Sequence, residues 1–135
     1  MTEQPICLNQ ITINGFKSIK ALEHLPLSAL NLLIGANGAG KSNFIKALTL
    51  LNTIIEKKLQ LWIGREGGAD DIFYFGQTSE LQIEWQFNNQ SGELVHYQCT
   101  LIPAHDTLIF AQEVGSWQKK SADKPETIFN RRWTP

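Results

Sequence analysis

The stretch LNLLIGANGAGKSNFIKAL, residues 30–48, decides the fold of this chain. It begins with a nearly continuous apolar run that ends at Gly35, as a parallel strand buried on both faces of a sheet does. From Ser42 onward, apolar residues recur at spacings of three and four, which is the pattern of an amphipathic helix. The stretch therefore predicts a buried strand, a tight loop and a helix over residues 42–62.

The loop between these elements matches the pattern G-x-x-x-x-G-K-[ST] from Gly35 to Ser42. Glycines let backbone N–H groups turn inward around a phosphate, and the helix adds unpaired N–H groups and its positive dipole end. We expect Lys41 to bridge the β- and γ-phosphates of ATP and the Ser42 hydroxyl to bind Mg²⁺. The predicted cofactor-binding residues are Gly35, Ala36, Asn37, Gly38, Ala39, Gly40, Lys41, Ser42 and Asn43, with Ser42 as the metal ligand.

Strand-like runs lie on either side of this region. Ile11 and Ile13 indicate a half-exposed opening strand, and the later runs LQIEWQF, LVHYQCTLI and TLIFAQEVGSW indicate an antiparallel meander. The predicted fold class is α/β: a P-loop NTPase with a mixed sheet, one main helix and an antiparallel β lobe. We divide the chain into a partial nucleotide-binding core at 1–79, the lobe at 80–119 and a polar, basic tail at 120–135 that has no closing element. A sheet without a closing element leaves an edge strand with no hydrogen-bonded neighbour, and this predicts poor solubility or self-association of the chain.

The composition argues against several other classes of protein. The formal net charge of -1 over 135 residues gives no overall basic field, and Cys7 and Cys99 fit neither a disulfide framework nor a CxxC metal site. The histidines His24, His96 and His105 lack the spacing of metal ligands. No apolar run reaches the length of about 18 residues that a membrane helix needs, so we expect a cytoplasmic protein with no membrane partner.

Two asparagine-containing phrases narrow the loop motif further: NGAGKSN at residues 37–43 and NGFKSI at residues 14–19. Together with GGADDIFYFGQTSE at residues 67–80, they make the chain resemble the N-terminal portion of prokaryotic AAA-type core ATPases of the RecF, SMC and OLD group. The resemblance implies an ABC-type ATPase head, ATP-driven closure of two heads, and a link to DNA repair or phage defence. It also implies that Phe16 and Lys17 flank the base or the phosphates; an ordinary core phenylalanine and a solvated lysine are the alternative.

Residues for ATP hydrolysis are not apparent in the sequence. Hydrolysis needs a second strand of four apolar residues that ends in Asp and is followed by Glu, and the nearest run, TLIFAQE, has Ala and Gln at that place. Asp70 and Asp71 fall in a glycine-rich loop, and Gln77 follows a turn, whereas the family's Mg²⁺-side glutamine ends a deep strand. Gly67 and Gly68 lack the serine of the family's signature segment. No catalytic residue is assigned, and we expect the chain alone to bind MgATP weakly and not to turn it over.

Two functions fit these observations. In the first, the chain is the ATP-binding part of a RecF- or SMC-like ATPase, as a short or truncated product or as half of a split enzyme. A C-terminal ATPase half, or a second head in a homodimer, would complete it. In the second, the chain is a non-enzymatic module whose meander binds a partner and whose P-loop is vestigial. DNA is a further candidate partner, because residues 119–132 carry five basic and two acidic side chains with Phe129 among them and Trp133 next to them; a solvated or partner-covered tail is the alternative.

Overall fold

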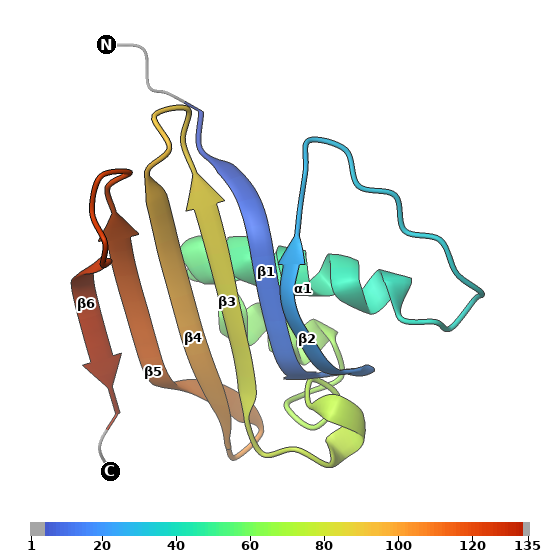
Figure 1. Cartoon of the computed structure of the whole chain (residues 1–135). Coiled ribbons are helices and arrows are strands. Elements are labelled where there is room, and N and C mark those ends of the chain that lie inside the picture. The colour runs from blue at the N-terminus through green and yellow to red at the C-terminus, as the bar shows by residue number, and fades with distance from the viewer. Residues whose placement is uncertain (1–4, 134–135) are drawn as a thin grey trace.

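The computed structural model describes residues 5–133 as one antiparallel sheet with two helices on one of its faces (Figure 1). The strands are β1 (Cys7–Phe16), β2 (Ile19–Pro26), β3 (Leu81–Asn88), β4 (Leu94–Ala104), β5 (Thr107–Gln118) and β6 (Glu126–Arg132), in the order β2-β1-β3-β4-β5-β6. Between β2 and β3 lie the helices α1 (Lys41–Ile55) and α2 (Leu59–Arg65) and a short 3-10 turn at Tyr74–Gly76. The chain is therefore α/β, as the sequence predicts.

The core lies between the sheet and the helices. Ile11 and Ile13 on β1, and Ile83 and Trp85 on β3, are fully buried and form one cluster with residues of α1 such as Leu50. The residues that alternate with them on β3 are glutamine and glutamate, which point to the other face and stay partly exposed. The sheet thus buries one face, and the helices are attached to that face (Figure 1).

The apolar run before the glycine-rich loop is not a strand. Leu30, Leu32 and Ile34 are 87%, 80% and 85% exposed, and residues 27–40 form an irregular excursion between β2 and α1 (Figure 1). A strand buried on both faces needs a hydrogen-bonded neighbour on each side, and within residues 5–133 no strand pairs with this run. The prediction of a buried parallel strand is wrong, and so is that of a mixed sheet, because every pairing of the described strands is antiparallel.

The single helix predicted over residues 42–62 is two helices. After α1 ends, the backbone at Lys57 is left-handed, with φ of 59°, and this conformation interrupts a right-handed helix. The Lys58 amide then donates to the carbonyl oxygen of Thr53 at 2.9 Å and closes the last turn. After the break, α2 contacts β5, and Trp62 of α2 packs against the core.

The last part of the described chain adds a sixth strand to the sheet. β6 pairs with β5 and leaves an edge of mostly exposed side chains, so the prediction of a tail without a closing element is wrong. Gly115 of β5 leaves space for the ring of Phe129, which also lies 6.4 Å from the Tyr97 ring. The predicted meander is confirmed as β3, β4 and β5, and these strands continue the sheet that β1 and β2 begin. The division of the chain into three parts stays a prediction.

Candidate nucleotide-binding site

The glycine-rich loop leads directly into α1. Gly38 and Gly40 have φ values of 82° and 98°, in a region that residues with a Cβ atom rarely adopt. Gly40 immediately precedes α1; among the described residues no side chain caps this helix end, and its first turn holds no acidic residue. The first backbone N–H groups of a helix have no partner within the helix. The start of α1 therefore offers the N–H groups and the dipole end that favour an anion.

Lys41 folds back onto the loop. Its ε-ammonium group donates hydrogen bonds to the carbonyl oxygens of Gly35 and Ala36, at 2.5 and 2.7 Å. Ala39 lies beside Gly35, since a Cβ placed on Gly35 would be 3.3 Å from the Ala39 Cβ. An open hollow of about 330 Å³ at the loop is lined by the other six of the predicted residues: Asn37, Gly38, Gly40, Lys41, Ser42 and Asn43. The nine predicted residues thus share one loop and the first turn of α1.

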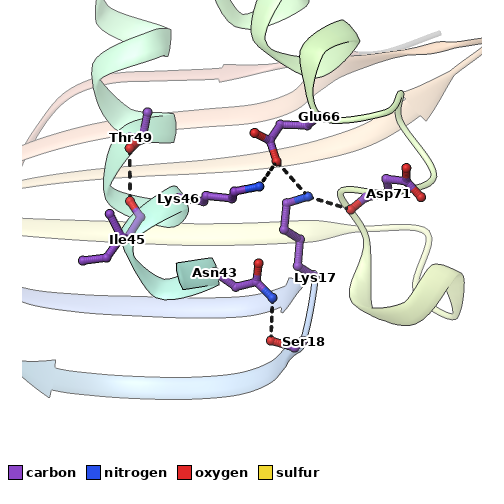
Figure 2. Close-up of polar contacts among 8 residues, drawn as sticks. All are labelled: Lys17, Ser18, Asn43, Ile45, Lys46, Thr49, Glu66 and Asp71. Atoms are coloured by element: carbon purple, nitrogen blue, oxygen red, sulfur yellow. Dashed lines mark hydrogen bonds and ion pairs between the residues drawn. The ribbon is translucent and has the colours of Figure 1, made fainter. Parts of the chain in front are cut away.

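The turn between β1 and β2 braces the start of α1. The side-chain amide of Asn43 donates a hydrogen bond of 2.8 Å to the hydroxyl oxygen of Ser18 (Figure 2). The same hydroxyl would be 3.0 Å from a Cβ on Gly40, so the turn and the loop are in close contact. Sequence reasoning did not select Ser18, although it stands in the phrase NGFKSI that supported the family resemblance.

A second hollow, of about 340 Å³, adjoins the first at Asn43, and we call it the Lys17 pocket. Phe75 at its wall is 69% exposed and takes a left-handed backbone conformation with φ of 43°, which is rare for an aromatic residue. The residues that line this pocket are Lys17, Ser18, Asn43, Glu66, Asp70, Asp71, Phe73, Phe75 and Gly76. The pocket therefore brings together an ammonium group, carboxyl groups, an amide and exposed aromatic surface next to the glycine-rich loop.

Two lysines share one carboxylate in the Lys17 pocket, and we call Lys17, Lys46 and Glu66 the Glu66 cluster. The Oε2 atom of Glu66 lies 3.0 Å from the ammonium nitrogen of Lys17 and 2.6 Å from that of Lys46 (Figure 2). Lys17 also donates to the backbone carbonyl oxygen of Asp71 at 3.1 Å. Burial raises the pKa of the Glu66 carboxyl, but the hydrogen bonds and charges of the two lysines outweigh it, so the pKa lies below its ordinary value.

Several residues singled out in the sequence have other roles. Phe16 is fully buried and its ring stacks on Trp62 with centroids 6.5 Å apart, so Phe16 is a core residue. The Lys17 side chain is only 11% exposed and is not a solvated lysine. Gln77 follows the 3-10 turn, and Cys99 is buried in the core.

Clustered metal ligands and membrane-spanning helices are both absent from the described part of the chain. Residues 5–133 contain no group of three or more His, Cys, Asp or Glu side chains placed to hold a metal ion. Over the same residues, the helices are all too short or too polar to cross a membrane.

Comparison with known proteins gives the class of this chain. Residues 7–131 match the model of the AAA ATPase domain family, and the chain belongs to that family. Over 46 residues it is 39% identical to the DNA replication and repair protein RecF of Thioalkalivibrio sulfidiphilus, which covers 34% of this chain and 13% of that protein. Over 121 residues it is 26% identical to the DNA double-strand break repair Rad50 ATPase of Pyrococcus abyssi, which covers 90% of this chain and 13% of that protein.

These relatives confirm the resemblance to RecF- and SMC-like AAA-type ATPases that the loop motif and its flanking phrases predict. A second RecF protein, from Vibrio atlanticus, is 41% identical over 44 residues and is covered to 12% of its length. The chain thus spans about an eighth of the length of the RecF and Rad50 relatives it matches.

Proposed function

We propose that this chain is the ATP-binding part of a RecF- or SMC-like ATPase with an ABC-type head, linked to DNA repair or phage defence. The observation that carries the proposal is the loop at the start of α1, where Gly38 and Gly40 take left-handed conformations and Lys41 already lies inside the loop. The names of the RecF and Rad50 relatives support the link to DNA repair.

The chain's own residues would bind ATP in the following way. Lys41 exchanges the carbonyl oxygens of Gly35 and Ala36 for phosphate oxygens, and the N–H groups at the start of α1 bind the same phosphates. Ser42 lines the hollow, and its hydroxyl suits Mg²⁺, an ion that keeps several of its waters and needs few protein ligands. When bound, Mg²⁺ neutralises charge on the phosphates. We further propose that part of the nucleotide, including a phosphate oxygen, extends into the Lys17 pocket, which adjoins the loop at Asn43.

Calorimetric titration with MgATP tests this function. We expect a dissociation constant on the order of tens of micromolar for the natural chain. Lys41→Ala should weaken binding by about tenfold or more, because it removes a charge-assisted hydrogen bond to phosphate. Lys124→Ala, which removes an exposed lysine before β6, is the matched control and should leave the affinity unchanged. Binding that Lys41→Ala does not weaken would contradict the proposal, and no binding at all would favour the module with a vestigial P-loop.

We propose that the chain alone does not hydrolyse ATP, that it acts in the cytoplasm, and that residues 30–34 are covered by a C-terminal ATPase half or a second head. The exposure of Leu30, Leu32 and Ile34 supports the last point, because solvent-exposed apolar runs of this kind mark interaction surfaces. A phosphate-release assay that shows several turnovers per minute would contradict the first point. Light scattering after size-exclusion chromatography tests the third: we expect self-association that Leu32→Lys reduces, and a clean monomer would count against a second head.

DNA is a second candidate ligand, favoured by the basic edge that β5 and β6 form. The Lys119 ammonium lies 5.1 Å from the centre of the Trp117 ring, and the Arg131 guanidinium 5.4 Å from that of Phe129, so each cation stands over an aromatic face. We expect fluorescence anisotropy with a short duplex to show weak binding that falls steeply with salt. The slope of the logarithm of the binding constant against the logarithm of the salt concentration should become less steep when Lys119 and Arg131 are replaced by alanine. The expected reduction is about one for each phosphate contact that is lost. Lys20→Ala on the opposite edge should not change the slope.

A further inference from the structure

The Glu66 cluster contains two lysine ammonium groups and one carboxylate, so one ammonium group is enough to balance the charge of Glu66. Lys17 and Lys46 approach the same oxygen of Glu66, and the Lys46 contact is the shorter, at 2.6 against 3.0 Å (Figure 2). Lys46 comes from α1, and its side chain is 42% exposed, whereas that of Lys17 is 11% exposed. Lys46 can therefore keep Glu66 paired if Lys17 leaves, so the part-buried carboxylate is not left alone.

The backbone at Lys17 is held in a rarely populated conformation. Lys17 and Phe75 have φ values of 49° and 43°, and the Phe75 amide donates to the Lys17 carbonyl oxygen at 3.1 Å. The Lys17 amide in turn donates to the Ile72 carbonyl oxygen at 2.8 Å. Strained residues of this kind persist where their surroundings fix them, and they gather at ligand sites. Here the two strained residues are joined by a backbone hydrogen bond, and both line the Lys17 pocket.

The pocket that Lys17 lines also adjoins the proposed phosphate site. Ser18, the next residue, accepts a hydrogen bond from Asn43 and contacts the loop at Gly40. The Lys17 pocket and the hollow at the loop meet at Asn43. The contact of Lys17 with Asp71 is to the backbone carbonyl oxygen, a neutral acceptor that the ammonium can exchange for a stronger anion.

We propose that Glu66 competes with the bound nucleotide for the Lys17 ammonium. On nucleotide binding, Lys17 leaves Glu66 for a phosphate oxygen, and Lys46 alone remains on Glu66. This inference rests on the proposed function and adds to it a positioning residue, Glu66, and a partner, Lys46, that makes the exchange inexpensive. The hydrogen bonds of the Lys17 backbone with Ile72 and Phe75 hold the residue in place while its side chain exchanges partners.

The test is a set of calorimetric titrations with MgATP. Glu66→Gln keeps the shape and the hydrogen-bond acceptor of Glu66 but removes its charge, so Lys17 no longer gives up an ion pair on binding. We expect about fivefold tighter MgATP binding, ~1 kcal/mol, which is the scale of one part-exposed ion pair. Lys46→Met should weaken binding by about as much, because the departure of Lys17 would then leave Glu66 unpaired. The opposite signs of the two changes are not expected if the cluster only stabilises the fold.

Lys17→Met supplies the decisive control. If exchange of Lys17 causes the gain, Glu66→Gln should not tighten binding in the Lys17→Met background. An equal gain with and without Lys17 would overturn the inference in favour of simple repulsion between Glu66 and phosphate, and unchanged or weaker binding by Glu66→Gln would overturn it as well. If Lys41→Ala weakens MgATP binding but Glu66→Gln leaves it unchanged, this inference is wrong and the proposed function stands. If Lys41→Ala does not weaken binding, the proposed function is wrong as well. Lys46 is half-exposed, so Lys46→Met should fold even if a variant of the more buried Glu66 does not.

Discussion

The contact between Gly115 and Phe129 gives a sharp test of how β6 is attached to the sheet. A Cβ atom on Gly115 would lie 2.4, 2.7 and 3.0 Å from three carbon atoms of the Phe129 ring, which is closer than such atoms approach. The ring would have to swing away from Tyr97 and from under the Arg131 guanidinium, or β6 would have to shift. Overpacking costs about 1–3 kcal/mol, and replacing glycine in a strand returns about 0.5–1 kcal/mol. We therefore expect Gly115→Ala to lower the free energy of unfolding by about 1–2 kcal/mol.

Urea unfolding followed by tryptophan fluorescence measures this change. Gly64→Ala is the matched control, because a Cβ on Gly64 meets nothing within 4 Å and alanine favours the helix α2. It should raise the free energy of unfolding by about 0.5–1 kcal/mol. In a Phe129→Ala background, Gly115→Ala should lose its cost, since no ring remains to be displaced. If Gly115→Ala is neutral or stabilising in the natural chain, the ring of Phe129 does not lie on Gly115.

Three further changes test the core, a buried thiol and the brace of the loop. Leu50→Ala on α1 should lower the free energy of unfolding in urea by about 2–5 kcal/mol, because Leu50 is fully buried. Burial, and then the charge of Glu113, raises the pKa of the Cys99 thiol above its ordinary value of 9.0. The folded chain thus holds this proton more tightly than the unfolded chain does. The free energy of unfolding in urea should therefore keep its full value below about pH 9 and fall as the pH rises above it. In Cys99→Ala the fall should be less steep. Ser18→Ala removes the acceptor of the Asn43 amide and should lower the free energy of unfolding by about 1 kcal/mol, measured in the same way.

The parts of the fold that the sequence predicts correctly depend on local signals. The glycines of the loop and the spacing of three and four after Ser42 place α1 within one residue of its observed start at Lys41. Alternation of apolar and polar residues identifies β3, where buried and part-exposed residues alternate, and the strand-like runs LVHYQCTLI and TLIFAQEVGSW identify β4 and β5. Both signals are contained in short segments and need no knowledge of distant residues.

The errors arise where neighbours in space decide the structure. Residues 30–34 have the composition of a buried strand, but burial requires strands on either side, and among residues 5–133 none pairs with them. β6 is mostly polar because it is an edge strand, so its sequence resembles a tail. Glu66 and Ser18 were missed for a related reason: their partners Lys17 and Asn43 lie 49 and 25 positions away along the chain. A local pattern carries no information on such contacts.

The two arms of the glycine-rich loop differ in their support, and this difference would be a physical cause of the weak nucleotide binding that we expect. On the α1 side, Asn43 is bonded to Ser18, and the Glu66 cluster ties α1 to the β1–β2 turn. On the other side, residues 30–34 are exposed and pair with no described strand, so fewer contacts hold that arm, and we expect phosphate binding to restrict its motion at a cost in entropy. A partner that covered residues 30–34 would remove this cost beforehand and raise the affinity without touching the nucleotide. Coupling between that partner and ATP would then be reciprocal, because each would favour the same ordered loop.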